Sequence, residues 1–115
     1  MPEKTKLLVA KIRTEFENNQ INEELLKRLY QQYNHLNDIN AFVRKAKNSF
    51  PHLNCGLATV YLKGILQKGR IVNGKYKKYN HTFLIIGKKM VIDITSDQYG
   101  GPKIYVGPLR DPWSL

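Results

Sequence analysis

The stretch NHTFLIIGKKMVIDIT, residues 80–95, decides the fold class of this chain. It contains two runs of β-branched and aromatic residues joined at Gly87-Lys88-Lys89, which is the pattern of a β-hairpin. A further short strand is expected in GGPKIYVGPL, residues 100–109, between two Gly-Pro breaks. Before residue 69 the apolar residues recur at helical spacing instead. Helices first and antiparallel strands second predict an α+β domain.

Four helices are expected ahead of the hairpin. The first spans residues 3–17, and Asn22 is expected to cap the second. The third covers residues 38–50 and stops at Pro51, which cannot continue a helix. The fourth covers residues 55–69, with apolar residues along one face.

Length and composition describe one globular domain. The 115 residues are 42% hydrophobic and 10% aromatic, and they contain no repeat or linker. We therefore expect a single domain over residues 1–115, with a helical part at 1–50 and the remaining helix and strands at 51–115. No apolar run is long enough to span a membrane, and MPEKTKLLVAK has no signal-like segment. A cytoplasmic protein is expected, or one delivered into a target cell.

Charge is distributed unevenly along the chain. The formal net charge is +10, and between Asp38 and Asp93 there are 11 Lys or Arg residues and no acid. This section is expected to attract an anionic partner, which can be an acidic protein, a membrane surface or a nucleic acid. A lysine-rich solvated surface has the same composition.

The single cysteine lies where the fourth helix is expected to start. If Asn54 caps that helix, Cys55 takes its first position, where free backbone N–H groups and the helix dipole stabilise a thiolate. Gly56 would let a substrate backbone approach, and the Cys55 N–H could hold an oxyanion. The alternative is that Cys55 is a small buried hydrophobe. One cysteine excludes an internal disulfide and a cysteine-rich zinc site, and suits a reducing compartment.

The length of the turn after residue 86 decides whether His81 and Asp93 can meet. A three-residue loop at 87–89 places them diagonally on one face of the hairpin, and a loop at 86–88 places them directly opposite. A two-residue loop would put them on opposite faces. Asp93 interrupts an apolar strand and needs a partner there, because an unpaired buried charge is costly. His81 is the natural candidate, and a lysine or arginine is the alternative.

The segments NCG, NHTFLIIG and VIDITSDQY together resemble the papain-like and transglutaminase-like cysteine enzymes. The similarity is closest to small papain-fold domains of bacterial polymorphic toxins and to related bacterial and phage proteins with an Asp-x-Thr-x-Asp-Gln-aromatic segment. It covers residues 50–115. The resemblance implies a papain-like core in which Cys55 is the nucleophile, His81 the base and Asp93 the third member of a catalytic triad. An acid at this place follows transglutaminases, whereas papain uses asparagine.

Two features depart from the protease pattern. Papain-like proteases place a glutamine shortly before the cysteine to complete the oxyanion hole, and this chain has none between Gln32 and Cys55. Asn48, Asn54 and Gln98 are the candidates to replace it. The chain also lacks room for a second lobe, so general proteolysis is not expected.

The resemblance implies a cysteine hydrolase or transferase without a metal or cofactor. Water would resolve its thioester in a protease, amidase or glutamine deamidase, and an amine would do so in a transglutaminase-like enzyme. A bacterial toxin or effector of this type is expected to act on a protein with an acidic surface and to meet a cognate inhibitor or immunity protein.

Two alternatives stay open. The segment KGRIVNGKYKKYNH, residues 68–81, mixes five basic residues with Tyr76 and Tyr79. This composition is typical of proteins that bind single-stranded nucleic acid. It favours a nucleic-acid-binding or ribonuclease toxin domain in which His81 acts without Cys55. An exposed loop has the same composition, and Tyr79 could instead wall the active site. A non-catalytic interaction domain on the same fold is the second alternative.

The remaining polar and aromatic residues are expected to be structural. His35 and His52 are predicted to lie on the surface, and no histidine spacing fits a metal site. Asp97 and Gln98 are expected to tie down the following loop through bonds to the backbone. Trp113 is expected to pack on the core or on a partner, within an exposed tail GPLRDPWSL.

Overall fold

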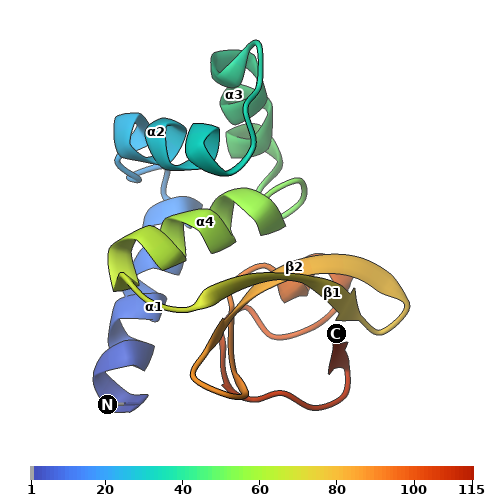
Figure 1. Ribbon diagram of the computed structural model, residues 1–115. Helices are drawn as coiled ribbons and strands as arrows, with labels where there is room; N and C mark the ends of the chain where they lie inside the picture. The colour runs from blue at the N-terminus through green and yellow to red at the C-terminus, as the bar shows by residue number, and fades with distance from the viewer. Residues whose placement is uncertain (1) are drawn as a thin grey trace.

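The computed structural model describes residues 2–115 as four helices followed by a five-stranded antiparallel sheet, so the predicted α+β class is confirmed (Figure 1). None of the helices in these residues is both long and apolar enough to cross a membrane. The helices are α1 (Pro2–Glu17), α2 (Glu23–Tyr33), α3 (Ile39–Ser49) and α4 (Cys55–Leu66). The strands are β1 (Arg70–Tyr76), β2 (Tyr79–Ile86), β3 (Met90–Asp93), β4 (Tyr105–Pro108) and β5 (Trp113–Ser114), and a short 3-10 helix, η1 (Ser96–Tyr99), follows β3.

Local signals set the helix ends. The side chain of Asn22 caps α2 as predicted, by accepting a hydrogen bond from the Leu25 N–H. Asp38 does the same for α3, by accepting from the Ala41 N–H. The fourth helix starts at residue 55 as expected but ends at residue 66, before the predicted limit, because Gln67 adopts a left-handed conformation there.

The strand order is β4-β3-β2-β1-β5, with every neighbouring pair antiparallel. Ile86 pairs with Met90 across the β2–β3 turn, so the loop is the three-residue one. Residues 81 and 93 therefore share a face, as that loop length predicts.

Residues 70–76 form a strand that the sequence analysis did not assign. This basic segment pairs with β2 along its whole length, from Arg70 opposite Ile85 to Tyr76 opposite Tyr79. Its alternation is hard to read because the exposed residues Arg70, Asn73 and Lys75 do not all lie on one side of the strand, and Gly74 occupies a buried position. This segment is thus one arm of a hairpin and not a loop.

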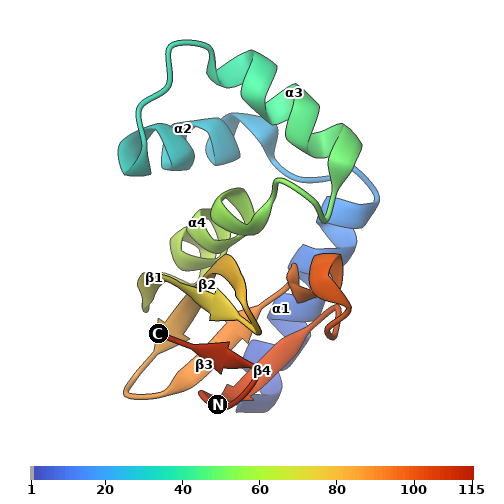
Figure 2. The same cartoon turned by 90° about the vertical axis from the view of Figure 1, so that its right-hand side faces the viewer.

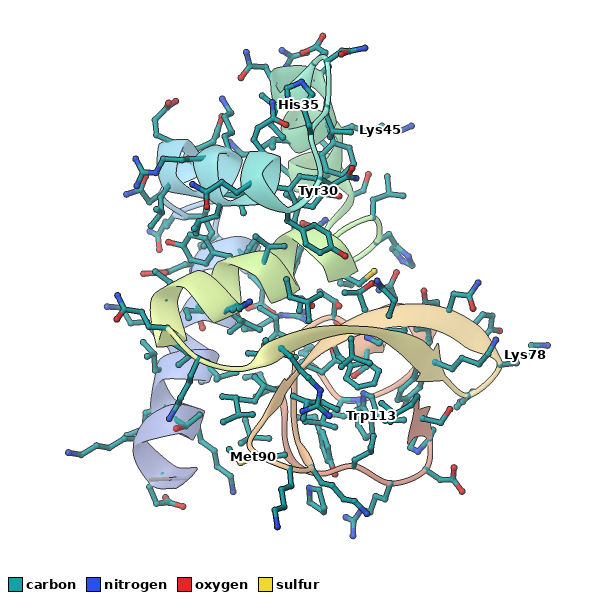
Figure 3. All side chains as sticks on the ribbon, viewed as in Figure 1. Tyr30, His35, Lys45, Lys78, Met90 and Trp113 are labelled. Atoms are coloured by element: carbon teal, nitrogen blue, oxygen red, sulfur yellow. The ribbon has the colours of Figure 1, made fainter. Side chains whose placement is uncertain are left out.

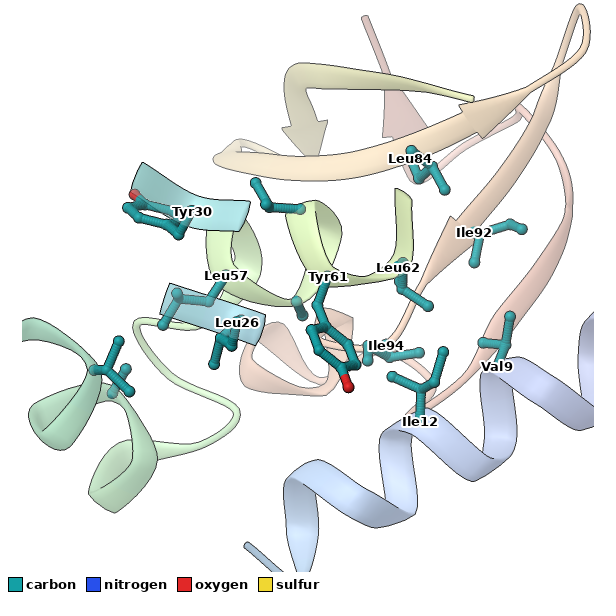
Figure 4. Packing of buried hydrophobic residues seen from close by; sticks show 14 residues of the cluster. Val9, Ile12, Leu26, Tyr30, Leu57, Tyr61, Leu62, Leu84, Ile92 and Ile94 are labelled. Atoms are coloured by element: carbon teal, nitrogen blue, oxygen red, sulfur yellow. The ribbon is translucent and has the colours of Figure 1, made fainter. Parts of the chain in front are cut away.

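Two apolar clusters lie on the two faces of the sheet. On one face, α4 packs along β2, with α2 and α3 beyond it and α1 alongside (Figures 1 and 2). The larger cluster joins buried residues of all four helices to three residues of β2, β3 and the chain after β3: Leu84, Ile92 and Ile94 (Figure 4). The smaller cluster on the other face contains Tyr76, Phe83, Ile85, Val91 and Trp113. Because the second half of β2 is covered on both faces, its sequence is continuously apolar over residues 83–86.

The C-terminal segment 107–115 is largely exposed, as expected, but its end joins the sheet. Strand β5 pairs with β1, with Trp113 opposite Tyr76, and the tryptophan is 4% exposed. Gly74 of β1 permits this pairing, because a β-carbon there would lie 2.3 Å from the Ser114 carbonyl oxygen. The chain end is therefore part of the sheet.

Arg13 connects α1 to the segment after β3. It is 4% exposed and forms a two-pronged ion pair with Asp97, each N–O distance being 2.8 Å. It also donates to the Ile94 carbonyl. The prediction that Asp97 holds its own loop through backbone bonds was wrong, because its carboxylate pairs with an arginine 84 residues earlier.

Arg13→Leu is expected to lower the free energy of unfolding by about 3 kcal/mol, because it removes one partner of a largely buried ion pair. Urea unfolding followed by circular dichroism measures this. Arg44→Leu is the matched control on the exposed surface of α3 and is expected to change the free energy by less than about 0.5 kcal/mol. Equal effects of the two substitutions would contradict this role of Arg13.

Candidate active site

Cys55 is the first residue of α4, as the sequence predicts, and its side chain is partly exposed. Asn54 holds the N-cap position, but its side chain does not cap the helix. The amide nitrogen instead donates to the carbonyls of Ala46 (2.7 Å) and His52 (2.8 Å), inside the loop that precedes α4. Asn54 thus anchors that loop. Its side-chain oxygen accepts no hydrogen bond from the N–H groups of the first helical turn.

His81 and Asp93 form a buried pair. The imidazole Nε2 lies 2.7 Å from the Asp93 Oδ2, and both residues are 2% exposed. The second ring nitrogen, Nδ1, is buried and has no hydrogen-bond partner among residues 2–115. This leaves one nitrogen of the ring free to exchange a proton.

The thiol of Cys55 and the ring of His81 shift each other's pKa. Burial opposes ionisation of the thiol, but His81 and the backbone of Thr82 favour the thiolate, so the pKa of Cys55 is lowered. Burial also opposes the imidazolium, but Asp93 and the neighbouring thiol outweigh it and raise the pKa of His81 to about 9. Both shifts favour a thiolate beside an imidazolium. The two residues that the resemblance pairs are therefore neighbours.

Three groups hold the Asp93 carboxylate. Besides His81, the Thr95 N–H donates to Oδ1 (2.9 Å) and the Trp113 indole Nε1 donates to Oδ2 (2.8 Å). The three donors satisfy the buried carboxylate and fix it in place. Sequence reasoning gave Trp113 only a packing role, because nothing local indicates that β5 returns beside Asp93. Figure 3 shows Trp113 on the side of the sheet opposite α4.

Aromatic rings surround the imidazole. Tyr99 meets the His81 ring edge to face, with centroids 5.3 Å apart, and Tyr76 lies 6.3 Å away. Burial and the charge of Cys55 raise the pKa of Tyr99, which places its hydroxyl within the field of the thiolate. Tyr79 stacks on Tyr99 at 4.6 Å and is 42% exposed, so it walls the site from outside.

The candidates for the oxyanion hole have different surroundings. The amide hydrogens of Asn54 are already engaged, and Asn48 is exposed on α3, where it lines a polar hollow with Glu23 and Lys47. The Nε2 of Gln98 is buried without a hydrogen-bond partner in residues 2–115. Among the three side-chain amides, only Gln98 therefore has a buried donor left unsatisfied.

Gly56 faces α2 rather than open space. A β-carbon there would lie 3.6 Å from Tyr30 Cε1 and 3.7 Å from the Tyr30 hydroxyl oxygen. Figure 3 shows this tyrosine reaching from α2 toward the start of α4. Tyr30 thus covers the position that was expected to admit a substrate backbone.

The other histidines lie apart from this cluster. His35 and His52 are exposed, as predicted. Over residues 2–115, no group of three or more His, Cys, Asp or Glu side chains is placed to hold a metal ion. Comparison of the chain with protein-family models, curated proteins and solved structures gives no match.

His81 is expected to keep its proton up to about pH 9, since Asp93 and the thiol stabilise the imidazolium. In Asp93→Asn the burial remains but the carboxylate charge is lost, so the pKa of His81 should fall by more than one unit. Nuclear magnetic resonance titration of the imidazole, assigned with His81→Gln, measures both values. A wild-type ring that loses its proton near its ordinary value of about 6.5 would contradict the coupling.

Trp113→Phe is expected to destabilise the fold by about 2 kcal/mol, because it removes a buried donor to a charged acceptor and keeps an aromatic ring. Thermal unfolding measures the loss. Tyr105→Phe is the control: it removes a solvent-exposed hydrogen bond from the tyrosine hydroxyl to the Pro108 carbonyl, in the ring stacked on Trp113. Equal losses of stability in the two variants would contradict a stabilising role of the Trp113–Asp93 hydrogen bond.

Proposed function

We propose that the protein is a thiol-dependent acyl-transfer enzyme of the papain-like or transglutaminase-like type, with Cys55, His81 and Asp93 as its triad. The observation that carries the proposal is the buried His81–Asp93 pair beside a cysteine at a helix N-terminus. The lowered pKa of Cys55 and the raised pKa of His81 support the same assignment. Structural ion pairs also shift pKa values, but they do not need a partly exposed thiol at a helix start.

The reaction begins as the Cys55 thiolate attacks the carbonyl carbon of an amide. The C–S bond forms, and the carbonyl oxygen becomes an oxyanion, which a backbone N–H at the start of α4 and the Gln98 amide can stabilise. Protonated His81 then gives its Nδ1 proton to the leaving amine as the C–N bond breaks, which leaves a thioester. Asp93 keeps Nε2 engaged throughout, so Nδ1 is the nitrogen that transfers the proton.

The thioester is resolved by a second attack. His81, now neutral, removes a proton from water or from an acceptor amine, which attacks the same carbonyl and releases the Cys55 thiolate. Water gives hydrolysis or deamidation, and an amine gives transfer. The net charge of +10 favours a protein target with an acidic surface, as for a toxin or effector that acts in a cell and is held in check by an inhibitor protein.

The nucleic-acid alternative has weaker support. Of its two stacking tyrosines, Tyr76 is 4% exposed and packed against Trp113, so its ring faces are not available to a base. Tyr79 alone of the two is exposed. The non-catalytic alternative requires a sealed thiol, whereas Cys55 is partly exposed.

The test is the pH dependence of Cys55 alkylation by iodoacetamide. Wild-type protein is expected to react at about pH 6, where an ordinary thiol is almost entirely protonated. His81→Ala should slow that reaction at least about tenfold, since each pKa unit changes the thiolate fraction tenfold. His52→Ala, at an exposed histidine of the loop before α4, is the matched control and should react like wild type.

If Cys55 were alkylated with the pH dependence of an ordinary thiol in both wild type and His81→Ala, the proposed enzyme activity would be overturned. Binding to nucleic acid that weakens steeply with salt and survives Cys55→Ala would favour the nucleic-acid alternative in its place.

A further inference from the structure

The tip of the β1–β2 hairpin carries positive charge into the neighbourhood of the proposed triad. Lys77 and Lys78 form the turn, and both are exposed. Within residues 2–115 neither makes an ion pair with a carboxylate, including Asp111 of the C-terminal turn, whose neighbour Pro112 accepts a hydrogen bond from the Lys77 N–H. Figure 3 shows Lys78 at this tip. Two unpaired ammonium groups are thus available to an outside anion.

Aromatic rings hold these ammonium groups in place. The Lys78 Nζ lies 5.7 Å from the centroid of Tyr79, and the Lys77 Nζ lies 5.8 Å from that of Tyr76. Cation–π attraction at such distances restricts where a flexible lysine places its charge. The tip therefore presents a positioned pair of cations rather than two freely moving side chains.

The same rings lead to His81 by direct contacts. Tyr79 stacks on Tyr99 almost in parallel, with an interplanar angle of 4°, and Tyr99 meets the His81 ring at 5.3 Å. A Tyr99 hydroxyl bond to the Asn80 carbonyl fixes this stack to β2. Because extended chain covers about 3.3 Å per residue, about five residues match the path along these rings from the Lys78 Nζ to His81.

We infer that Lys77, Lys78 and Tyr79 form a recognition subsite for an acidic peptide segment, which binds with its carboxylates a few residues from the amide that Cys55 attacks. This inference rests on the proposed function and gives it a substrate class: a protein chain in which acidic residues flank the target amide. Opposite charge supplies the attraction, and the Tyr79–Tyr99 stack supplies a rigid apolar floor along which the segment lies.

The probes are iodoacetyl-Gly-Gly-Gly peptide amides ending in Glu-Glu, Gln-Gln or Lys-Lys. Each alkylates Cys55 by displacement of iodide by the thiolate, so the labelling rate reports how well the peptide is held beside the site. At low ionic strength the Glu-Glu probe is expected to label wild-type protein roughly tenfold faster than the Gln-Gln probe, and the Lys-Lys probe more slowly than either.

Lys77→Asn/Lys78→Gln should abolish this preference. Asparagine suits Lys77 because that residue has a positive φ of 56°. The matched control is Lys88→Asn/Lys89→Gln in the β2–β3 turn, which removes the same charge from two other exposed turn lysines and should keep the preference. Each labelling rate is divided by the rate of the same protein with plain iodoacetamide, which removes differences in the reactivity of the Cys55 thiol itself.

Equal loss of the preference in both double variants would overturn the subsite, because the effect would then belong to the overall charge. The subsite would also be overturned if wild-type protein reacted with iodoacetamide at about pH 6 but showed no preference among the peptide probes. That result would not contradict the proposed enzyme activity. Protection of Cys55 by a thymidine oligonucleotide, dependent on Lys77 and Lys78 and stronger than that by a free Glu-Glu peptide, would assign the subsite to phosphate instead.

Discussion

A carboxylate that is 2% exposed must be surrounded by donors, and the Asp93 carboxylate is the point on which the candidate site depends. Its three partners come from different places: His81 from β2, Trp113 from β5 and the backbone of Thr95 just beyond β3. Satisfying one buried charge therefore requires the sheet to be complete from β3 across to β5. The same requirement fixes the ring of His81 with Nδ1 free.

The Cys55 thiol lies beside this pair because α4 is held against β2. The Thr59 hydroxyl, 3% exposed, shares its hydrogen between the carbonyl of Cys55 (2.6 Å) and that of Thr82 (3.2 Å). This contact joins the first turn of the helix to the strand residue next to His81. Asn54 fixes the preceding loop through its amide hydrogens. The start of α4 is thus positioned by polar contacts at both sides of Cys55.

The segment from Asp93 to Tyr99 links the site to the N-terminal helices. Asp93 orients the imidazole, Asp97 pairs with Arg13 of α1, and Tyr99 lies against His81. Residues 1–50 showed no resemblance of their own, yet α1 holds the chain that shapes one wall of the site. The helical part is therefore a structural support of the candidate site and not an appendage.

Local patterns in the sequence determined the order of helices and strands, the cap at Asn22 and the residue at which α4 starts. These follow from properties of neighbouring residues, chiefly the helical and strand periods. The same patterns reduced the question of whether His81 and Asp93 share a face to the length of one turn, which the structure decided. Strand β1 was missed because its polar and apolar residues do not alternate regularly.

Only the tertiary structure decided the rest. The Trp113–Asp93 bond joins residues 20 apart and the Arg13–Asp97 pair residues 84 apart, and the Asn54 amide turns inward to carbonyls that packing brings near. A buried polar group takes the partner that the folded chain places beside it, and no local pattern records which one that is.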